Sequence, residues 1–147
     1  MEVCAVELHL LTGRGQPGRV EQSSVRAEAV KIVAEQPNYA EGLCVLGMAD
    51  AALGHKDDAI REGRRAVELL PVTKDAIIGA LLVKYLALIY AWTGEKDLAL
   101  EQLSVAVRIP SHLSYGQLRL HPFWDPLRDD PRFEKLVEES KKPVALK

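Results

Sequence analysis

The chain has 147 residues, of which 48% are hydrophobic and 27% are charged, a balance that excludes a disordered or fibrous protein and fits one soluble domain. Its 19 basic and 21 acidic side chains are interspersed and give a net charge of -2, so we expect no nucleic acid partner. The apolar stretch near the N-terminus is interrupted and short, so we expect no membrane insertion and a cytoplasmic protein.

Within residues 1–38 the sequence predicts one helix. Apolar residues recur at helical spacing between Glu21 and Glu35, and Pro37 ends the pattern. Ahead of it, residues 13–18 read G-R-G-Q-P-G, a literal match to the G-x-G-x-x-G motif of dinucleotide-binding folds. Such a fold needs a second strand after the helix, whereas another amphipathic helix follows here, and Pro17 lacks the N–H that would hold phosphate. We therefore interpret residues 13–18 as a loop and expect no nucleotide cofactor.

A repeat with an offset of 40 residues organises the middle of the chain. The sequence G-H-K-D-D-A at residues 54–59 recurs as G-E-K-D-L-A at residues 94–99. Each copy predicts a helix, a left-handed glycine turn and a second helix with an acidic first turn. Small residues stand where the helices of a pair would cross. These residues are Gly47, Ala59 and Ala66 in the first copy and Ala87, Ala99 and Ala106 in the second.

These spacings resemble the tetratricopeptide repeat, whose pattern is W-x-x-L-G-x-x-Y, then A-x-x-x-F, then P. In the first copy Leu46, Gly47 and Pro71 match, and Asp50 replaces the tyrosine; in the second copy Tyr90 matches. The resemblance implies an all-α fold, namely an α-solenoid of antiparallel helix pairs within a single domain of residues 1–147. Its predicted parts are a degenerate repeat (1–38), a repeat (39–71), a repeat whose lengthened first helix starts near Thr73 or Lys74 (72–110), a cap (111–140) and a tail (141–147).

The segment after Ile109 predicts a cap of short helices. Four prolines exclude a long helix, while apolar side chains provide anchors. These anchors are Phe123, Trp124, Leu127, Phe133, Leu136 and Val137. The last repeat of a solenoid leaves an apolar face open, which such a segment can cover. Residues 90–95, 115–118 and 124–133 also resemble the C-terminal tetratricopeptide tails of bacterial serine/threonine kinases, adenylate cyclases and winged-helix regulators.

Candidate chemical groups are scattered along the chain. The four histidines and two cysteines show no metal-binding spacing, so we expect no metal. The adjacent carboxylates Asp57-Asp58 and Asp129-Asp130 fit helix capping better than acid–base catalysis. The arginines of residues 61–65, with Glu62 among them, fit a solvated helix face better than a phosphate patch. We expect neither catalysis nor a cofactor.

The resemblance places a partner-binding groove on the first helix of each pair. Its residues are Glu41, Cys44, Met48 and Ala52 from the first helix, and Leu81, Lys84, Leu88 and Trp92 from the second. Family members that clamp the carboxylate tails of heat-shock chaperones have lysine and asparagine where Cys44, Met48 and Leu88 stand, so we expect no such clamp.

The sequence therefore predicts a scaffold that binds a protein or peptide through this mainly apolar groove. Two alternatives stay open. In the first, the helix at residues 21–35 or the C-terminal cap covers the groove residues, so that they serve only as core. In the second, the chain is a structural tail that forms a homodimer and positions an attached signalling domain.

Overall fold

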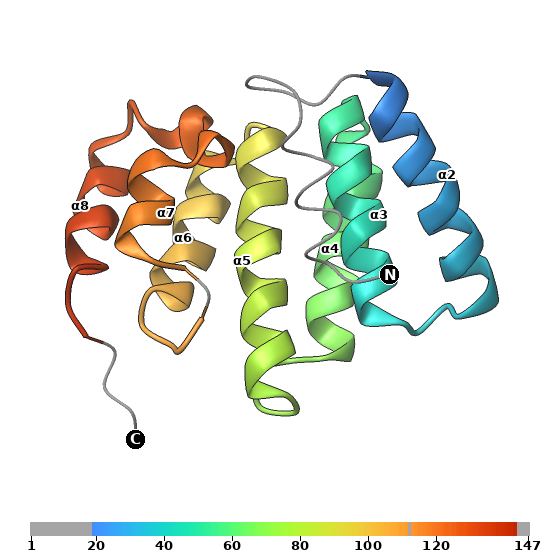
Figure 1. Ribbon diagram of the computed structural model, residues 1–147, viewed down its shortest axis with the longest axis horizontal. Coiled ribbons are helices and arrows are strands. Elements are labelled where there is room, and N and C mark those ends of the chain that lie inside the picture. Colours follow the sequence, from blue (N-terminus) through green and yellow to red (C-terminus); the bar gives the residue numbers. More distant parts are fainter. Residues whose placement is uncertain (1–18, 112, 144–147) are drawn as a thin grey trace. The chain divides into compact units, whose positions relative to one another are not determined.

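The structure is a computed structural model that describes residues 19–111 and 113–143 (Figure 1). In this part of the chain all regular secondary structure is helical and no strand occurs, which confirms the predicted all-α class. The glycine-rich residues 13–18 lie outside the described part. The elements are α2 (Arg19–Glu35), α3 (Ala40–Leu53), α4 (Lys56–Leu69), α5 (Ala76–Trp92), α6 (Lys96–Ala106), α7 (Tyr115–Leu120), the 3-10 helix η1 (Pro122–Leu127) and α8 (Pro131–Glu139).

The chain divides into two compact units between Leu69 and Leu70, close to the predicted repeat boundary after Pro71. In the first unit α3 packs against both α2 and α4. Residues 42–51 of α3 are all buried, as expected of a helix that is apolar on nearly every side. By contrast α4 is amphipathic and buries one stripe, which consists of Ala59, Glu62, Gly63 and Ala66. The small residues of this stripe let α4 approach α3 closely.

The two copies of the sequence repeat have the same turn geometry. Gly54 and Gly94 both adopt the left-handed conformation, with φ of 86° and 84°. In each turn the glycine N–H donates to the carbonyl three residues earlier, at 3.3 and 3.4 Å, and the following N–H donates to the carbonyl five residues earlier, at 2.8 and 2.9 Å. These bonds satisfy carbonyl groups that a helix end leaves without partners. The predicted glycine turns are therefore present in both units.

The second unit begins with α5, which has 17 residues against 14 in α3. The helix starts at Ala76 and not at Thr73 or Lys74, because the Asp75 carboxylate caps it by accepting from the N–H groups two and three residues later, at 3.0 and 2.9 Å. Residues 79–91 are all buried, and α6 packs against this helix.

The C-terminal segment of the second unit folds into short helices that contact the earlier ones. Here η1 packs against α5, and α8 packs against α6 and α7. Pro122 and Pro131 are the first residues of η1 and α8, where the missing N–H costs no helical hydrogen bond. All six predicted apolar anchors are buried, which gives the segment its core: Phe123, Trp124, Leu127, Phe133, Leu136 and Val137.

Candidate functional site

Four of the eight predicted groove residues lie on α3. Cys44 and Met48 are buried, with 1% and 0% of their surface exposed, whereas Glu41 and Ala52 are partly exposed. Burial raises the pKa of the Cys44 thiol to about 12, which keeps it protonated and unreactive at neutral pH. A partner can therefore reach Glu41 and Ala52, while contact with Cys44 or Met48 requires movement of the chain.

The other four groove residues lie on α5. Leu81, Lys84 and Leu88 are buried, and Trp92 is partly exposed. The indole Nε1 of Trp92 donates to the backbone carbonyl of Phe123 at 3.2 Å, and the two rings meet edge-on with centroids 5.3 Å apart. Trp92 thus anchors η1 to α5, a contact that agrees with the alternative in which the C-terminal cap covers part of the predicted groove.

A buried polar cluster joins the three helices of the first unit. We call it the Asp50 cluster, and its members are Arg26 from α2, Asp50 from α3, His55 from the turn and Glu62 from α4. The Asp50 side chain is fully buried. Its Oδ1 atom accepts from Arg26 Nε at 2.5 Å and lies 2.6 Å from Nδ1 of His55. Because one carboxylate contacts three other elements, it fixes α2, the turn and α4 around α3.

The two carboxyl groups of the Asp50 cluster have opposite pKa shifts. Burial alone would raise the pKa of Asp50, but hydrogen bonds from Arg26, His55 and Glu62 outweigh burial and hold it below its ordinary value. Burial, reinforced by the neighbouring Asp50 carboxylate, raises the pKa of Glu62 to about 8. At neutral pH, Asp50 is therefore ionised and Glu62 carries a proton.

The Asp50 cluster was not predicted from the sequence, although the sequence contains two signals of it. Asp50 and Glu41 are the two charged residues in α3, and Asp50 replaces an aromatic residue of the repeat pattern. Glu62 lies three residues after Ala59 and four before Ala66, and therefore on the buried stripe of α4. The interpretation of Glu62 as part of a solvated face is wrong, because its position in the helical period decides its burial.

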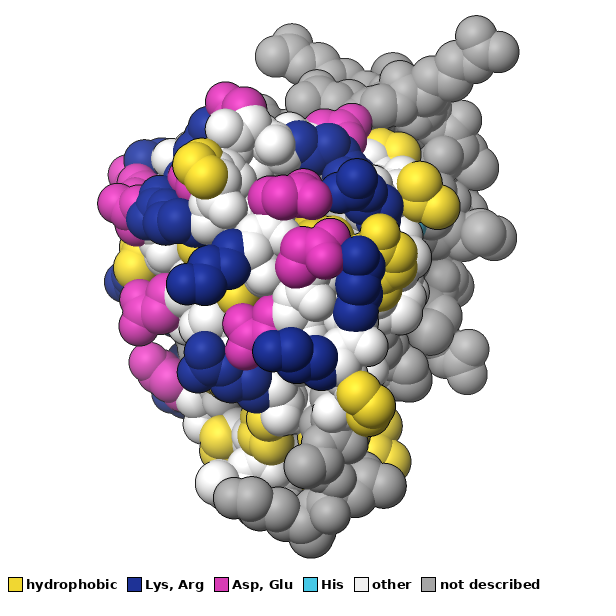
Figure 2. Space-filling model, turned by 90° about the vertical axis from the view of Figure 1, so that its left-hand side faces the viewer, with side chains coloured by type: hydrophobic (Ala, Val, Ile, Leu, Met, Phe, Trp, Pro, Cys, Tyr) yellow, Lys and Arg dark blue, Asp and Glu magenta, His cyan; other side chains and the backbone are white. Residues whose placement is uncertain are grey.

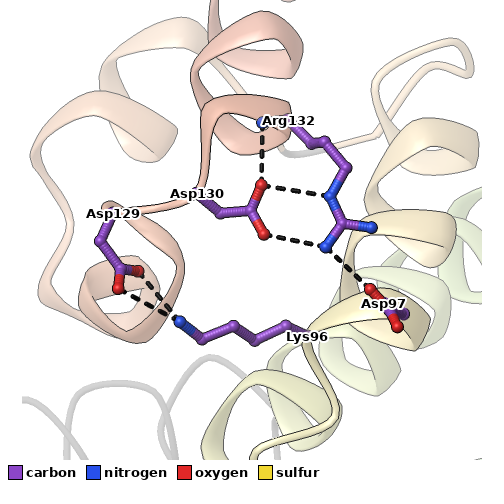
Figure 3. Close-up of polar contacts among 5 residues, drawn as sticks. All are labelled: Lys96, Asp97, Asp129, Asp130 and Arg132. Atoms are coloured by element: carbon purple, nitrogen blue, oxygen red, sulfur yellow. Dashed lines mark hydrogen bonds and ion pairs between the residues drawn. The ribbon is translucent and has the colours of Figure 1, made fainter.

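A second polar cluster, on the surface of the second unit, ties the start of α6 to the start of α8 (Figure 3). Lys96 Nζ contacts both carboxylate oxygens of Asp129, at 3.1 and 3.3 Å. Arg132 contacts Asp130 at 2.9 Å and Asp97 at 2.7 Å through its Nη2 atom. Hydrogen bonds from Arg132 lower the pKa of Asp130, whose carboxylate also caps α8. These contacts position the C-terminal helix, and the capping role predicted for Asp129-Asp130 is present at Asp130.

The outer surface near α8 carries mixed charge. Figure 2 shows basic and acidic side chains alternating over this face of the molecule. Arg119 contacts Glu134 at 2.6 Å, and Arg108 contacts Glu139 at 3.3 Å. Surface pairs of this kind stabilise little individually. The alternation gives the end of the second unit a solvated face with no uniform field for a nucleic acid or a lipid surface.

The arginines of α4 line a shallow hollow of about 380 Å³, together with acidic residues of the same helix. Arg61 contacts Asp58 at 2.7 Å, and Arg65 contacts Glu68 at 3.6 Å. Each of these guanidinium groups thus has a carboxylate partner three residues away. This mixed lining favours a solvated face over a phosphate site for Arg61 and Arg65.

Within residues 19–111 and 113–143, no three histidine, cysteine, aspartate or glutamate side chains are grouped so that they could hold a metal ion. The helices described there include none with the length and apolar character needed to cross a membrane. Comparison with models of protein families, with curated proteins and with solved structures found no match for this chain.

Proposed function

We propose that the chain is a tetratricopeptide-type α-solenoid that binds a protein or peptide without catalysing a reaction. The partner would contact the groove residues that are partly exposed, which are Glu41 and Ala52 in the first unit and Trp92 in the second. Of these three side chains, Ala52 and Trp92 are apolar and Glu41 is charged, a combination that suits an amphipathic helix or an extended peptide.

The observation that carries this proposal is the agreement between the sequence repeat and the backbone of the two helix pairs. Pairs 40 residues apart share the left-handed glycine and the same pattern of capping hydrogen bonds. The alanines at the expected crossings, Ala59, Ala66, Ala99 and Ala106, have at most 1% of their surface exposed. In repeat proteins generally, tandem helix pairs form extended surfaces that commonly bind partners.

Site-specific photocrosslinking tests the proposed surface. A photoreactive amino acid is introduced at position 41 or 52, which are partly exposed on α3, and at position 68 on α4 as a control, because Glu68 is exposed on another helix. We chose these positions over Met48, which is buried, and over Trp92, whose loss would disturb η1. After irradiation in the source cells, positions 41 and 52 should capture the same partner and position 68 should not. Equal capture at all three positions, or none at any, contradicts the proposal.

The alternative, a dimerising structural tail, gives a different result in the same experiment. Crosslinks from positions 41 and 52 would then join two copies of this chain. Light scattering on the purified chain would show a dimer whose mass falls to that of a monomer when Ala52 is replaced with arginine. A monomeric chain that still captures a foreign protein excludes the dimer.

A further inference from the structure

The Asp50 cluster contains two buried oxygen atoms that need a hydrogen bond. Asp50 Oδ2 and Glu62 Oε2 are inaccessible to solvent, and apart from each other's carboxyl group neither has a hydrogen-bond partner among the described residues. Leaving a buried polar atom without a partner is costly, and two ionised carboxylates side by side are costlier still. The two side chains are nevertheless in hydrogen-bonding position with respect to each other. One proton between them removes both difficulties, since a protonated Glu62 donates to an ionised Asp50.

The surroundings decide which carboxyl group is ionised. Arg26 and His55 both contact Asp50 Oδ1, so the negative charge is stabilised on Asp50. Glu62 has no comparable cationic partner: Arg61 Nη2 lies 3.9 Å from its Oε1, is closer to Asp58 at 2.7 Å, and its side chain is 68% exposed. Burial of Glu62, with 9% of its surface exposed, further disfavours its charge.

We infer that Asp50 and Glu62 share a single proton across the α3–α4 contact, and that loss of this proton at alkaline pH releases α4 from α3. The charged groups facing the pair are Arg26 from α2, His55 from the turn, and Asp58 and Arg61 from α4 itself. Once Glu62 is ionised, two adjacent carboxylates share one close guanidinium group, and repulsion acts directly between the two helices. We call this proton-dependent contact between Asp50 and Glu62 the latch. It does not depend on any partner that the chain binds.

The raised pKa of Glu62 decides whether the stability of the fold rises or falls with pH. The pKa of Glu62 rises from its ordinary 4.5 to about 8 in the folded chain. Between these two values the folded state binds one proton that the unfolded state has released, so stability falls as the pH rises. The latch is at full strength below pH 4.5 and is lost through about pH 8. Within this window the equilibrium constant for opening rises about tenfold for each pH unit.

Amide hydrogen exchange on the full chain tests the latch. Wild type is compared with Glu62→Gln, which keeps a donor for Asp50 but cannot ionise, and with Glu68→Gln, which removes an exposed carboxylate from the same helix. After correction for intrinsic exchange rates, opening of α4 in wild type and Glu68→Gln should increase about tenfold per pH unit between about pH 5 and about pH 8. In Glu62→Gln it should stay constant. Because His55 is present in all three proteins, the difference isolates Glu62, and the same slope in Glu62→Gln overturns the inference.

A second measurement does not depend on the folding of any variant. Carboxyl ¹³C NMR of the wild-type chain labelled at glutamate should show one resonance that titrates with a midpoint near pH 8, assigned to Glu62 by its absence from Glu62→Gln or by backbone connectivity. Titration of every glutamate in the ordinary range near pH 4 to 5 would show that no shared proton exists.

Discussion

Replacing Gly79 with alanine should destabilise the second unit, because a Cβ atom has no room at this position. The added carbon would lie 2.7 Å from the Val72 nitrogen and 2.8 Å from the Pro71 carbonyl carbon, which are both backbone atoms. The turn that carries them is held by hydrogen bonds from the N–H groups of Lys74 and Asp75 to the Pro71 carbonyl, at 2.9 and 3.1 Å. Neither a side-chain rotation nor a free loop movement can relieve the contact.

Two opposing effects set the size of the change in the free energy of unfolding. Alanine is a better helix former than glycine by about 1 kcal/mol, which favours the variant. Overpacking a closely packed site costs about 1–3 kcal/mol, and the rigid turn places this site toward the upper end. We therefore expect a net loss of about 1–2 kcal/mol in the free energy of unfolding.

Urea unfolding followed by tryptophan fluorescence is the appropriate assay, because both tryptophans, Trp92 and Trp124, lie in the second unit. Gly116→Ala is the matched control, since the nearest atom to its Cβ would be the Ser114 hydroxyl at 3.9 Å. The control should leave stability unchanged or raise it by less than about 1 kcal/mol. A Gly79→Ala chain as stable as wild type would refute the reasoning about the turn.

Three further predictions concern the turns, the η1 contact and the thiol. Gly54→Ala and Gly94→Ala should each cost about 1 kcal/mol in urea unfolding, because both residues have positive φ; equal stability to wild type would mean that the turns relax. Trp92→Phe should lower the free energy of unfolding by about 1 kcal/mol, because it removes the hydrogen bond to the Phe123 carbonyl. Unchanged stability in urea, together with a crystal structure in which η1 has not moved, would contradict this. Cys44 should resist iodoacetamide at neutral pH until urea unfolds the chain, as measured by peptide mass spectrometry; rapid alkylation of the native chain would show that the thiol is not buried.

Much of the helical framework was predictable because local signals agree with the tertiary structure. The periodicity between Glu21 and Glu35 marks α2 to within two residues of its start, and the two glycines mark the turns. The start of α5 was predicted two or three residues too early, because it was inferred from the length of the repeat offset, whereas the Asp75 cap sets the first helical residue. Helix ends depend on such single side-chain contacts, so periodicity alone places them less well than it places helix centres.

The candidate site was less predictable because it depends on contacts between distant residues. Arg26 and Asp50 are 24 residues apart, and neither has a local pattern that indicates the other. Trp92 was interpreted as a groove residue, yet its indole is engaged by Phe123, 31 residues later. Periodicity identifies which face of a helix is buried, whereas the identity of the covering element requires the fold.

The two copies of the repeat differ at the positions that build the Asp50 cluster. This difference predicts which helix opens at alkaline pH. At the offset of 40, Tyr90 corresponds to Asp50 and Gln102 corresponds to Glu62. The second copy thus has no carboxyl pair at these positions, although its turn has the same hydrogen bonds and its crossing alanines are equally buried. The backbone of the pair therefore does not require the carboxylates, since a tyrosine and an amide occupy the same places. It follows that alkaline opening should be confined to α4 and absent from α6, which makes the amides of α6 an internal reference in the exchange experiment.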